Sequence, residues 1–121
     1  MSLNLRVLMI VEDDPASRTS LASIFTRRGW AICAASTLSE AMAFLDHGLV
    51  PDCLVLDLTL PDGDGQDVLK KMRRNGLEMR VAVCTGTLDQ AKLSSVRSMN
   101  PGALLVKPID IAELEKVCNA S

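Results

Sequence analysis

The chain of 121 residues has no tyrosine, one tryptophan and two phenylalanines. Its core must therefore be built from aliphatic side chains. No apolar stretch reaches the roughly 18 residues that a membrane-spanning helix needs. The N-terminus lacks the basic region and the small-residue cleavage site of a signal peptide. The sequence leaves open whether residues 1–3 are native or a cloning remnant.

A strong excess of either charge is also missing, because the net charge is only −2. A general nucleic-acid surface would need a basic excess, so nucleic acid is not an expected partner, and neither is a membrane. Hydrophobic residues make up 48% and charged residues 23% of the chain, which is ordinary for a soluble globular protein. The length predicts a single domain over residues 1–121.

The four cysteines lack the C-x-x-C spacing of zinc and dithiol sites. They are Cys33, Cys53, Cys84 and Cys118, and three of them lie inside apolar runs. A thiol in such a run behaves as a small hydrophobic side chain. We therefore interpret the cysteines as reduced core residues and expect a cytoplasmic protein.

Nucleotide and calcium motifs are missing as well. The chain has no G-x-x-x-x-G-K-[ST], and Gly63-Asp64-Gly65 lacks the third glycine of a dinucleotide-binding loop. The segment 62–65 also lacks the alternating ligands and closing glutamate of an EF-hand. A nucleotide-binding module is therefore disfavoured, and turn formation is the simpler role of this segment. The scarcity of aromatic side chains disfavours a flavin-binding module.

Five apolar runs alternate with helical patterns along the chain. The runs are 7–11, 30–35, 53–56, 81–84 and 103–106. Continuous runs are typical of strands covered on both faces of a parallel sheet, and strand–helix alternation gives right-handed crossovers. We therefore expect a three-layer α/β fold with a doubly wound five-stranded parallel sheet, a flavodoxin-like (βα)5 arrangement. The order 2-1-3-4-5 is taken from that fold class.

Residues that favour helix starts stand before each helical pattern. They are Asp14 before Pro15, the capping boxes Thr37-Leu38-Ser39-Glu40 and Thr87-Leu88-Asp89-Gln90, Asp64 or Asp67, and Asp110. Glycines at 29, 48 and 76 are expected to end the first three helices. The helix after residue 90 has few apolar anchors, which are Leu93, Val96 and Met99.

Polar side chains follow four of the five runs. They are Glu12-Asp13, Asp57, Thr85 and Lys107. In such sheets ligands bind beyond the carboxyl ends of the strands, where the winding reverses, and for this order that point lies between the first and third strands. The acids at 12 and 13 should therefore lie beside Asp57, although about 45 residues separate them.

Converging carboxylates repel one another and would hold protons unless a cation joined them. Oxygen-only ligands suit Mg²⁺, or Mn²⁺, which keeps several waters and takes few protein ligands. We expect Asp13 and Asp57 to bind the ion directly and Glu12 to act through water. The main-chain carbonyl of Thr59 could add another oxygen.

A carboxylate can also act as a nucleophile and form an aspartyl phosphate. Asp57 is our candidate acceptor, and transfer to it requires in-line geometry and charge neutralisation. Lys107 would pair with Asp57 or with the phosphoryl group, and Thr85 would donate its hydroxyl to a phosphoryl oxygen. A cis Lys107–Pro108 bond would aim the lysine inward, and the sequence leaves its isomer open.

Together these motifs resemble the receiver domain of two-component response regulators, of the chemotaxis-regulator type, over essentially the whole chain. The matching segments are Val11-Glu12-Asp13-Asp14, Leu56-Asp57-Leu58-Thr59-Leu60-Pro61-Asp62-Gly63, Cys84-Thr85-Gly86 and Val106-Lys107-Pro108. The resemblance implies that Asp57 is the phosphoacceptor, that Glu12 and Asp13 are the acidic pair, that Thr85 is the switch hydroxyl, and that Lys107 is the conserved-type lysine.

The resemblance further implies a Mg²⁺-dependent phosphorelay function. A sensor histidine kinase or a histidine phosphotransfer protein would supply the phosphoryl group, and the receiver would then switch a protein-interaction surface. Such a domain catalyses only its own phosphorylation and dephosphorylation and is not otherwise an enzyme. The downstream partner would be a protein or an output domain outside this chain, and dimerisation is left open. His47 is not the donor histidine, because it lies near an expected helix end.

Two departures and one alternative remain. Leu104 stands three residues before the lysine, where receivers often carry Tyr or Phe, so an aromatic switch is excluded there. At the positions of Thr59 and Thr87, receivers often carry amide or acid side chains that position the water for hydrolysis. Their absence favours a long-lived aspartyl phosphate. The alternative is a metal-dependent phosphatase or phosphomutase with an aspartyl nucleophile. Such enzymes commonly carry a second acid where this chain has Thr59.

Overall fold

The computed structural model describes residues 5–77, 79–87 and 89–119. Its main sheet is parallel, with the order β2-β1-β3-β6-β7. These strands are β1 (Val7–Val11), β2 (Ala31–Ala35), β3 (Cys53–Leu56), β6 (Arg80–Thr85) and β7 (Ala103–Val106). The expected order 2-1-3-4-5 is therefore confirmed. The labels differ because a short antiparallel hairpin, β4 (Thr59–Leu60) and β5 (Gly63–Asp64), follows β3.

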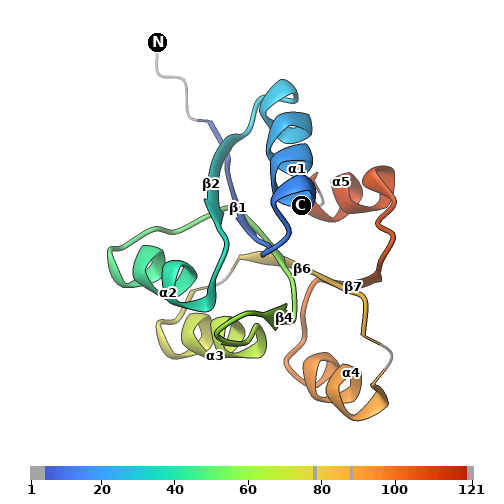
Figure 1. Ribbon diagram of the computed structural model, residues 1–121. Coiled ribbons are helices and arrows are strands. Elements are labelled where there is room, and N and C mark those ends of the chain that lie inside the picture. The colour runs from blue at the N-terminus through green and yellow to red at the C-terminus, as the bar shows by residue number, and fades with distance from the viewer. Residues whose placement is uncertain (1–4, 78, 88, 120–121) are drawn as a thin grey trace.

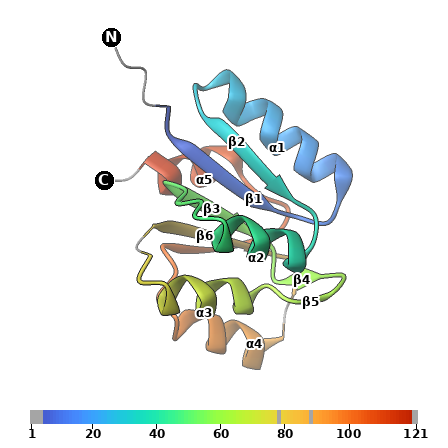
Figure 2. The same cartoon turned by 90° about the vertical axis from the view of Figure 1, so that its left-hand side faces the viewer.

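Helices cover both faces of the sheet, as Figure 1 shows. They are α1 (Pro15–Arg27), α2 (Leu38–Asp46), α3 (Gln66–Arg74), α4 (Gln90–Arg97) and α5 (Ile111–Asn119). Helices α1 and α5 lie on one face, and α2, α3 and α4 lie on the other (Figures 1 and 2). The two faces bury separate clusters, one around Phe25 and Leu114 and one around Leu69 and Val96. The three-layer α/β fold expected from the sequence is thereby confirmed.

Burial differs between the central strands and the edge strands. β1 and β3 are buried at every position except Val7, whereas the edge strands β2 and β7 are largely half-buried. Continuous apolar runs therefore predicted the strands correctly but overstated how completely the edge strands are covered. The reason is geometric, since an edge strand has a neighbour on one side only.

The helix starts follow the expected chemistry at α1, α2 and α5. Asp14 accepts a hydrogen bond from the Ser17 amide, and Thr37 accepts one from the Glu40 amide. Asp110 accepts from the amides that begin α5. These bonds satisfy backbone N–H groups that have no partner inside the helix.

The expected cap at Thr87 is wrong. Asp89 is the N-cap of α4, and its carboxylate accepts from the amides of Ala91 and Lys92. The Thr87 hydroxyl oxygen instead accepts the amide of Asp89 within the preceding turn. An aspartate two residues nearer the helix reaches its free amides and takes the capping position.

The start of α3 also differs in detail, because Gly65 occupies the N-cap position. Of the two acids expected to cap this helix, Asp64 accepts the amide of Gln66, while Asp67 lies in the first turn. Helices α1, α2 and α3 are followed by Gly29, Gly48 and Gly76 as expected. All three glycines adopt positive φ, the conformation that a side chain disfavours.

The hairpin β4–β5 was not anticipated from the sequence, which indicated only a turn there. Asp62, at its tip, accepts hydrogen bonds from the amides of Leu38 and Ser39 at 2.7 and 2.9 Å. These amide bonds, first that of Ser39, lower the pKa of the Asp62 carboxyl. Asp62 therefore acts as a second cap of α2 and ties that helix to the loop after β3.

None of the helices within residues 5–77, 79–87 and 89–119 has the length and apolar character required to cross a bilayer.

Candidate functional site

The carboxyl ends of β1 and β3 lie side by side at the centre of the sheet. Val11 pairs with Leu56 in parallel register, so the residues that follow, Glu12 and Asp57, become neighbours. The Asp57 amide donates to the carbonyl oxygen of Val11 at 2.9 Å, which extends the ladder to the acceptor candidate itself. The pairing of the strands thus fixes the backbone positions from which the Glu12 and Asp57 side chains extend.

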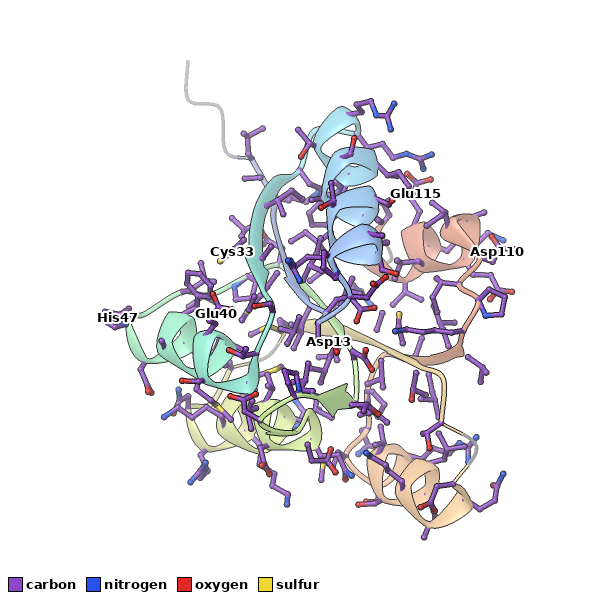
Figure 3. The ribbon with its side chains drawn as sticks, in the orientation of Figure 1. Asp13, Cys33, Glu40, His47, Asp110 and Glu115 are labelled. Atoms are coloured by element: carbon purple, nitrogen blue, oxygen red, sulfur yellow. The ribbon has the colours of Figure 1, made fainter. Side chains whose placement is uncertain are left out.

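Three carboxylates converge at this point. One oxygen each from Glu12, Asp13 and Asp57 lies within 4.8 Å of the others. Glu12 and Asp57 are buried, with exposed fractions of 4% and 7%, while Asp13 is exposed. Figure 3 places Asp13 at the strand tips below α1. An all-oxygen set with one open side matches the ligands that Mg²⁺ or Mn²⁺ prefers, so these residues fit such an ion.

Lys107, which directly follows the edge strand β7, contacts both buried acids. Its Nζ lies 2.7 Å from Glu12 Oε1 and 3.0 Å from Asp57 Oδ2. The Lys107–Pro108 peptide bond, which the sequence left open, is cis. The Lys107 amide donates to the Thr85 carbonyl oxygen at 2.8 Å, which anchors the lysine to the end of β6. The expected meeting of Lys107 with Asp57 is therefore observed.

Burial and charge shift the pKa values of this cluster. Burial, followed by the neighbouring Asp57 carboxylate, raises the pKa of Glu12, although its bond from Lys107 acts in the opposite direction. For Lys107, burial opposes the charged form, but its bonds to Glu12 and Asp57 outweigh burial and raise its pKa. The lysine is thus held protonated between the two acids.

The loop after β3 orients the Asp57 carboxylate. Oδ1 accepts the amide of Thr59 at 3.0 Å, while Oδ2 accepts from Lys107. Gly65 is essential for this loop, because a Cβ there would lie 2.2 Å from the Asp57 carbonyl oxygen. Sequence reasoning missed this role of Gly65, since it treated residues 62–65 only as a turn. The proposed metal contact of the Thr59 carbonyl stays a prediction.

Thr85 ends β6 with its side chain fully buried. Its hydroxyl oxygen accepts the amide of Thr87 at 3.0 Å, so it is engaged within its own loop. Residue Val106 pairs with Thr85 in the sheet register and leads directly to Lys107. The structure thus places Thr85 at the correct end of the sheet, and its contact with a phosphoryl group stays a prediction.

Two supporting contacts were invisible in the sequence. Arg18 donates to the carbonyl oxygens of Glu12 and Asp13 at 2.9 and 3.2 Å, which fixes the turn between β1 and α1. On the other side, the Ser95 hydroxyl donates to Gln66 Oε1 at 2.7 Å and links α4 to α3. Neither contact follows from spacing, because both depend on how helices settle on the sheet.

The site opens onto a cavity of about 360 Å³ between α1 and the loop after β7. Its lining includes the polar residues Glu12, Asp57 and Lys107. The apolar residues Leu21, Ile24 and Ile109 also line it. The buried carboxylate that carries our main prediction is therefore reachable from outside. His47 lies far from it, exposed after α2, as Figure 3 shows.

Comparison with known proteins points in one direction. A family model described as "Response regulator receiver domain" matches residues 8–119. The transcriptional regulatory protein FixJ of Azorhizobium caulinodans is 32% identical over 114 residues, which cover 93% of this chain and 53% of that protein. The acid tolerance regulatory protein ActR of Rhizobium meliloti is 35% identical over 109 residues, which cover 88% of this chain and 55% of ActR. The chain thus spans about half the length of these curated relatives.

Solved structures agree on the fold. A response regulator receiver protein from Pseudomonas putida superposes with a TM-score of 0.87 at 22% identity, covering 99% of this chain and all of that one (100%). A CheY-like receiver domain protein from Methanospirillum hungatei gives a TM-score of 0.86 at 24% identity, covering 93% and 90%. At these identities the likeness supports the arrangement of strands and helices.

Proposed function

Because the chain belongs to the family of response regulator receiver domains of two-component systems, we propose that Asp57 accepts a phosphoryl group and thereby switches a protein-interaction surface. The observation that carries this proposal is the position of Lys107. Its amine bridges Glu12 and Asp57, beside Asp13, at the open end of the sheet. An acceptor oxygen, a cation and a set of metal-binding oxygens therefore meet at one point.

Asp57 supplies the nucleophilic oxygen in this scheme. Its Oδ1 is held by the Thr59 amide and its Oδ2 by Lys107, so the carboxylate enters the reaction already oriented. Orientation matters in phosphoryl transfer because positioning and charge stabilisation provide most of the catalysis. The attacking oxygen forms a bond to phosphorus as the donor's bond to phosphorus breaks.

Glu12, Asp13 and Asp57 would hold a Mg²⁺ or Mn²⁺ ion. A bound divalent ion supplies positive charge that offsets the negative charge of the phosphoryl oxygens. Lys107 provides a second positive charge next to Glu12 and Asp57, and its raised pKa keeps it protonated at neutral pH. The protein's own contribution is thus two buried acids, one exposed acid and one fixed cation.

The conformational switch is expected to involve Thr85, the loop that follows it, and α4. Thr85 would turn its hydroxyl from the Thr87 amide toward the phosphoryl group and draw its loop inward, which would displace α4. The aromatic residue that often accompanies this change in the family is replaced by Leu104, a half-buried residue packed under the α2–α4 face. The surface of α4, β7 and α5, which carries the exposed Val106, is the proposed contact for a downstream protein.

The donor and the output are inferred from the family. Its receivers take phosphate from a histidine on a sensor kinase or a phosphotransfer protein, and we assign the same source here. FixJ and ActR are named as regulatory proteins and are about twice as long as the matched region, so an output domain or a separate protein is the proposed target. Receiver domains are generally not classical enzymes, and the only catalysis proposed here acts on the domain itself. The cytoplasmic location expected from the cysteines stays a prediction.

The test uses the full chain with a small acyl phosphate and Mg²⁺. Mass spectrometry should detect a gain of one phosphoryl group, mapped to Asp57, that is lost without the divalent ion and in Asp57→Asn. Asp52→Asn is a matched control, because Asp52 is an exposed acid at the opposite end of β3. Phosphorylation that persists in Asp57→Asn would overturn the proposal. Sustained turnover of a phosphomonoester would favour the phosphatase alternative.

A further inference from the structure

The most unusual contact outside the site joins two buried thiols. Cys53 begins β3 and Cys118 lies in the last turn of α5, 65 positions away in the sequence, yet their sulfur atoms are 3.0 Å apart. Both side chains are buried, with exposed fractions of 0% and 3%. Figure 2 shows the end of α5 beside the start of β3. A disulfide has a sulfur–sulfur distance of about 2.0 Å, so a movement of about 1 Å would close the bond.

We propose that Cys53 and Cys118 form a reversible intrachain disulfide that fastens α5 to the central strand β3. The interpretation of the four cysteines as reduced core residues gave no reason to expect this pair. The proposal does not rest on phosphorylation, because the two thiols lie at the amino end of β3, opposite to Asp57.

The surroundings of the pair distinguish the two thiols. The hydrogen bond from Cys53 lowers the pKa of Cys118, burial acts against this, and the Arg6 guanidinium adds to the lowering. The same hydrogen bond and burial raise the pKa of Cys53. Arg6 is held in place by a 2.6 Å bond to Asn119 and lies 4.1 Å from the centre of the Trp30 ring. Because Cys118 accepts the hydrogen bond from Cys53, we assign Cys118 as the thiolate that starts the reaction.

A hydroperoxide is the oxidant class that this chemistry requires. The Cys118 thiol loses its proton, the thiolate attacks the peroxide, and the O–O bond breaks to give a sulfenic acid and hydroxide. The hydroxide takes up the released proton and becomes water. The Cys53 sulfur then attacks the Cys118 sulfur, the S–O bond breaks, and the hydroxyl leaves as water with the Cys53 proton. In total, two thiols and hydrogen peroxide give one disulfide and two waters, so the two thiols provide the two electrons that reduce the peroxide. A dithiol reductant reverses the step by thiol–disulfide exchange.

The bond would act on a helix that is already anchored at this end. Glu115 of α5 pairs with Arg28, and Asn119 accepts from Arg6. The disulfide would add a covalent link across a long loop, which restricts the unfolded chain and raises stability. It would also hold α5 in one position against the sheet, and α5 forms part of the exposed face beside β7.

The other two cysteines provide the controls. Cys84 lies in the same buried cluster, and burial raises its pKa to about 12, which makes it a poor nucleophile. Cys33 is half-buried on the edge strand β2, on another part of the molecule (Figure 3). An oxidant that merely reacts with the most accessible thiol should therefore modify Cys33 first.

The experiment treats the full chain with hydrogen peroxide, blocks remaining thiols with N-ethylmaleimide under denaturing conditions, and maps peptides without reduction. We expect a linked peptide pair containing Cys53 and Cys118, and a chain lighter by two hydrogens before blocking. The midpoint of thermal unfolding should rise by about 10 °C and return after dithiothreitol treatment. Cys33→Ser should keep the linked pair and the shift, whereas Cys118→Ser should lose both.

Several results would overturn the proposal. They are oxidation confined to Cys33, links between separate chains, and the absence of the Cys53–Cys118 peptide from oxidised wild type. The wild-type peptide map decides the matter even if a cysteine variant folds poorly. A linked pair whose thermal midpoint equals that of the reduced protein would refute the fastening of α5.

Discussion

Two parts of the molecule on either side of the functional site differ in how completely they are buried. We call β1, β3 and the loop after β3 the acid-bearing half, and the loop after β6, α4 and β7 the outer half. β1 and β3 are buried almost throughout, whereas β7 is half-buried and ends in an exposed valine. Helix α3, which continues from the loop after β3, has four buried residues, and α4 has only two.

This difference matches what each half is proposed to do. The acid-bearing half must hold an acceptor carboxylate still, because small displacements are costly in phosphoryl transfer. The outer half must change position, and the free-energy cost of this change must be small enough for a few new contacts to offset it. Lys107 belongs to both, since its amine bonds the acids while its amide bonds the Thr85 carbonyl.

The largest expected effect follows removal of the cation that joins the halves. In Lys107→Gln the charge opposite Glu12 and Asp57 is lost, so transition-state charge is stabilised less well. The rate of phosphorylation by a small acyl phosphate should fall by about 10²-fold at saturating Mg²⁺. Stopped-time mass spectrometry measures this rate, and Lys70→Gln, which removes an exposed lysine paired with Asp67, serves as the control. A wild-type rate in Lys107→Gln would show that the lysine is structural only.

Metal binding provides the next test and concerns the acid-bearing half alone. Mg²⁺ at about 100 times its dissociation constant should stabilise the folded protein by about 2.7 kcal/mol. Asp13→Asn removes one of the three converging oxygens, and a tenfold loss of affinity would leave about 1.4 kcal/mol of this stabilisation. Urea unfolding with and without Mg²⁺ measures both values.

Asp46→Asn is the matched control for that experiment. It removes the same charge from the end of α2, where Asp46 pairs with Lys71 at the surface. The Mg²⁺-dependent stabilisation should be unchanged in this variant. Equal losses in Asp13→Asn and Asp46→Asn would mean that the ion responds only to net charge and not to the convergence of Glu12, Asp13 and Asp57.

Much of the acid-bearing half could be predicted from the sequence. Apolar runs that end in Glu12-Asp13 and in Asp57 identify two buried strands, and parallel packing then brings their tips together. The hairpin β4–β5 could not be predicted, because strands of two residues carry no periodicity. The cap that Asp62 places on α2 was hidden for another reason, since it joins residues more than 20 positions apart.

The outer half was harder to predict in detail. Thr87 and Asp89 are both good capping residues, and only the conformation of the loop decides that Asp89 caps α4. The contact between Cys53 and Cys118 depends on how α5 packs on the sheet, which no local pattern encodes. Residue Leu88, in the middle of the expected capping box, lies outside the described residues.

A pair of glycines compares the tolerance of the halves directly. Gly65→Ala would place a Cβ 2.2 Å from the Asp57 carbonyl oxygen and 3.0 Å from the Leu58 Cα, so the backbone must move. We expect a loss of about 1–3 kcal/mol in the free energy of unfolding. Gly86→Ala, in the loop after β6, meets nothing within 4 Å and should change stability by less than about 0.5 kcal/mol. Equal effects in urea unfolding would contradict the proposed difference in rigidity.

The smallest expected effect concerns the link between the halves through α4. The Ser95 hydroxyl donates to Gln66 Oε1 at 2.7 Å, and the Gln66 side-chain nitrogen in turn reaches Asp64 Oδ2 at 3.2 Å. Asp64 belongs to the hairpin after Asp57 and also lies 3.7 Å from the Lys92 amine on α4. This chain of contacts connects the loop after β3 to α4 without involving Thr85.

Ser95→Ala should therefore loosen α4 by about 1 kcal/mol, because Gln66 loses a donor at the edge of the core. Amide hydrogen exchange should become faster in α4 and stay unchanged in α3. Ser94→Ala is the matched control, since Ser94 is the same residue type, one position earlier and also exposed. If phosphorylation alters amide hydrogen exchange in α4 equally in wild type and Ser95→Ala, the proposed coupling to α4 depends on Thr85 and not on the Ser95–Gln66 contact. A smaller response in Ser95→Ala would mean that the loop after β3 acts on α4 directly. The proposed switch would then have a route that needs no aromatic residue at the position of Leu104.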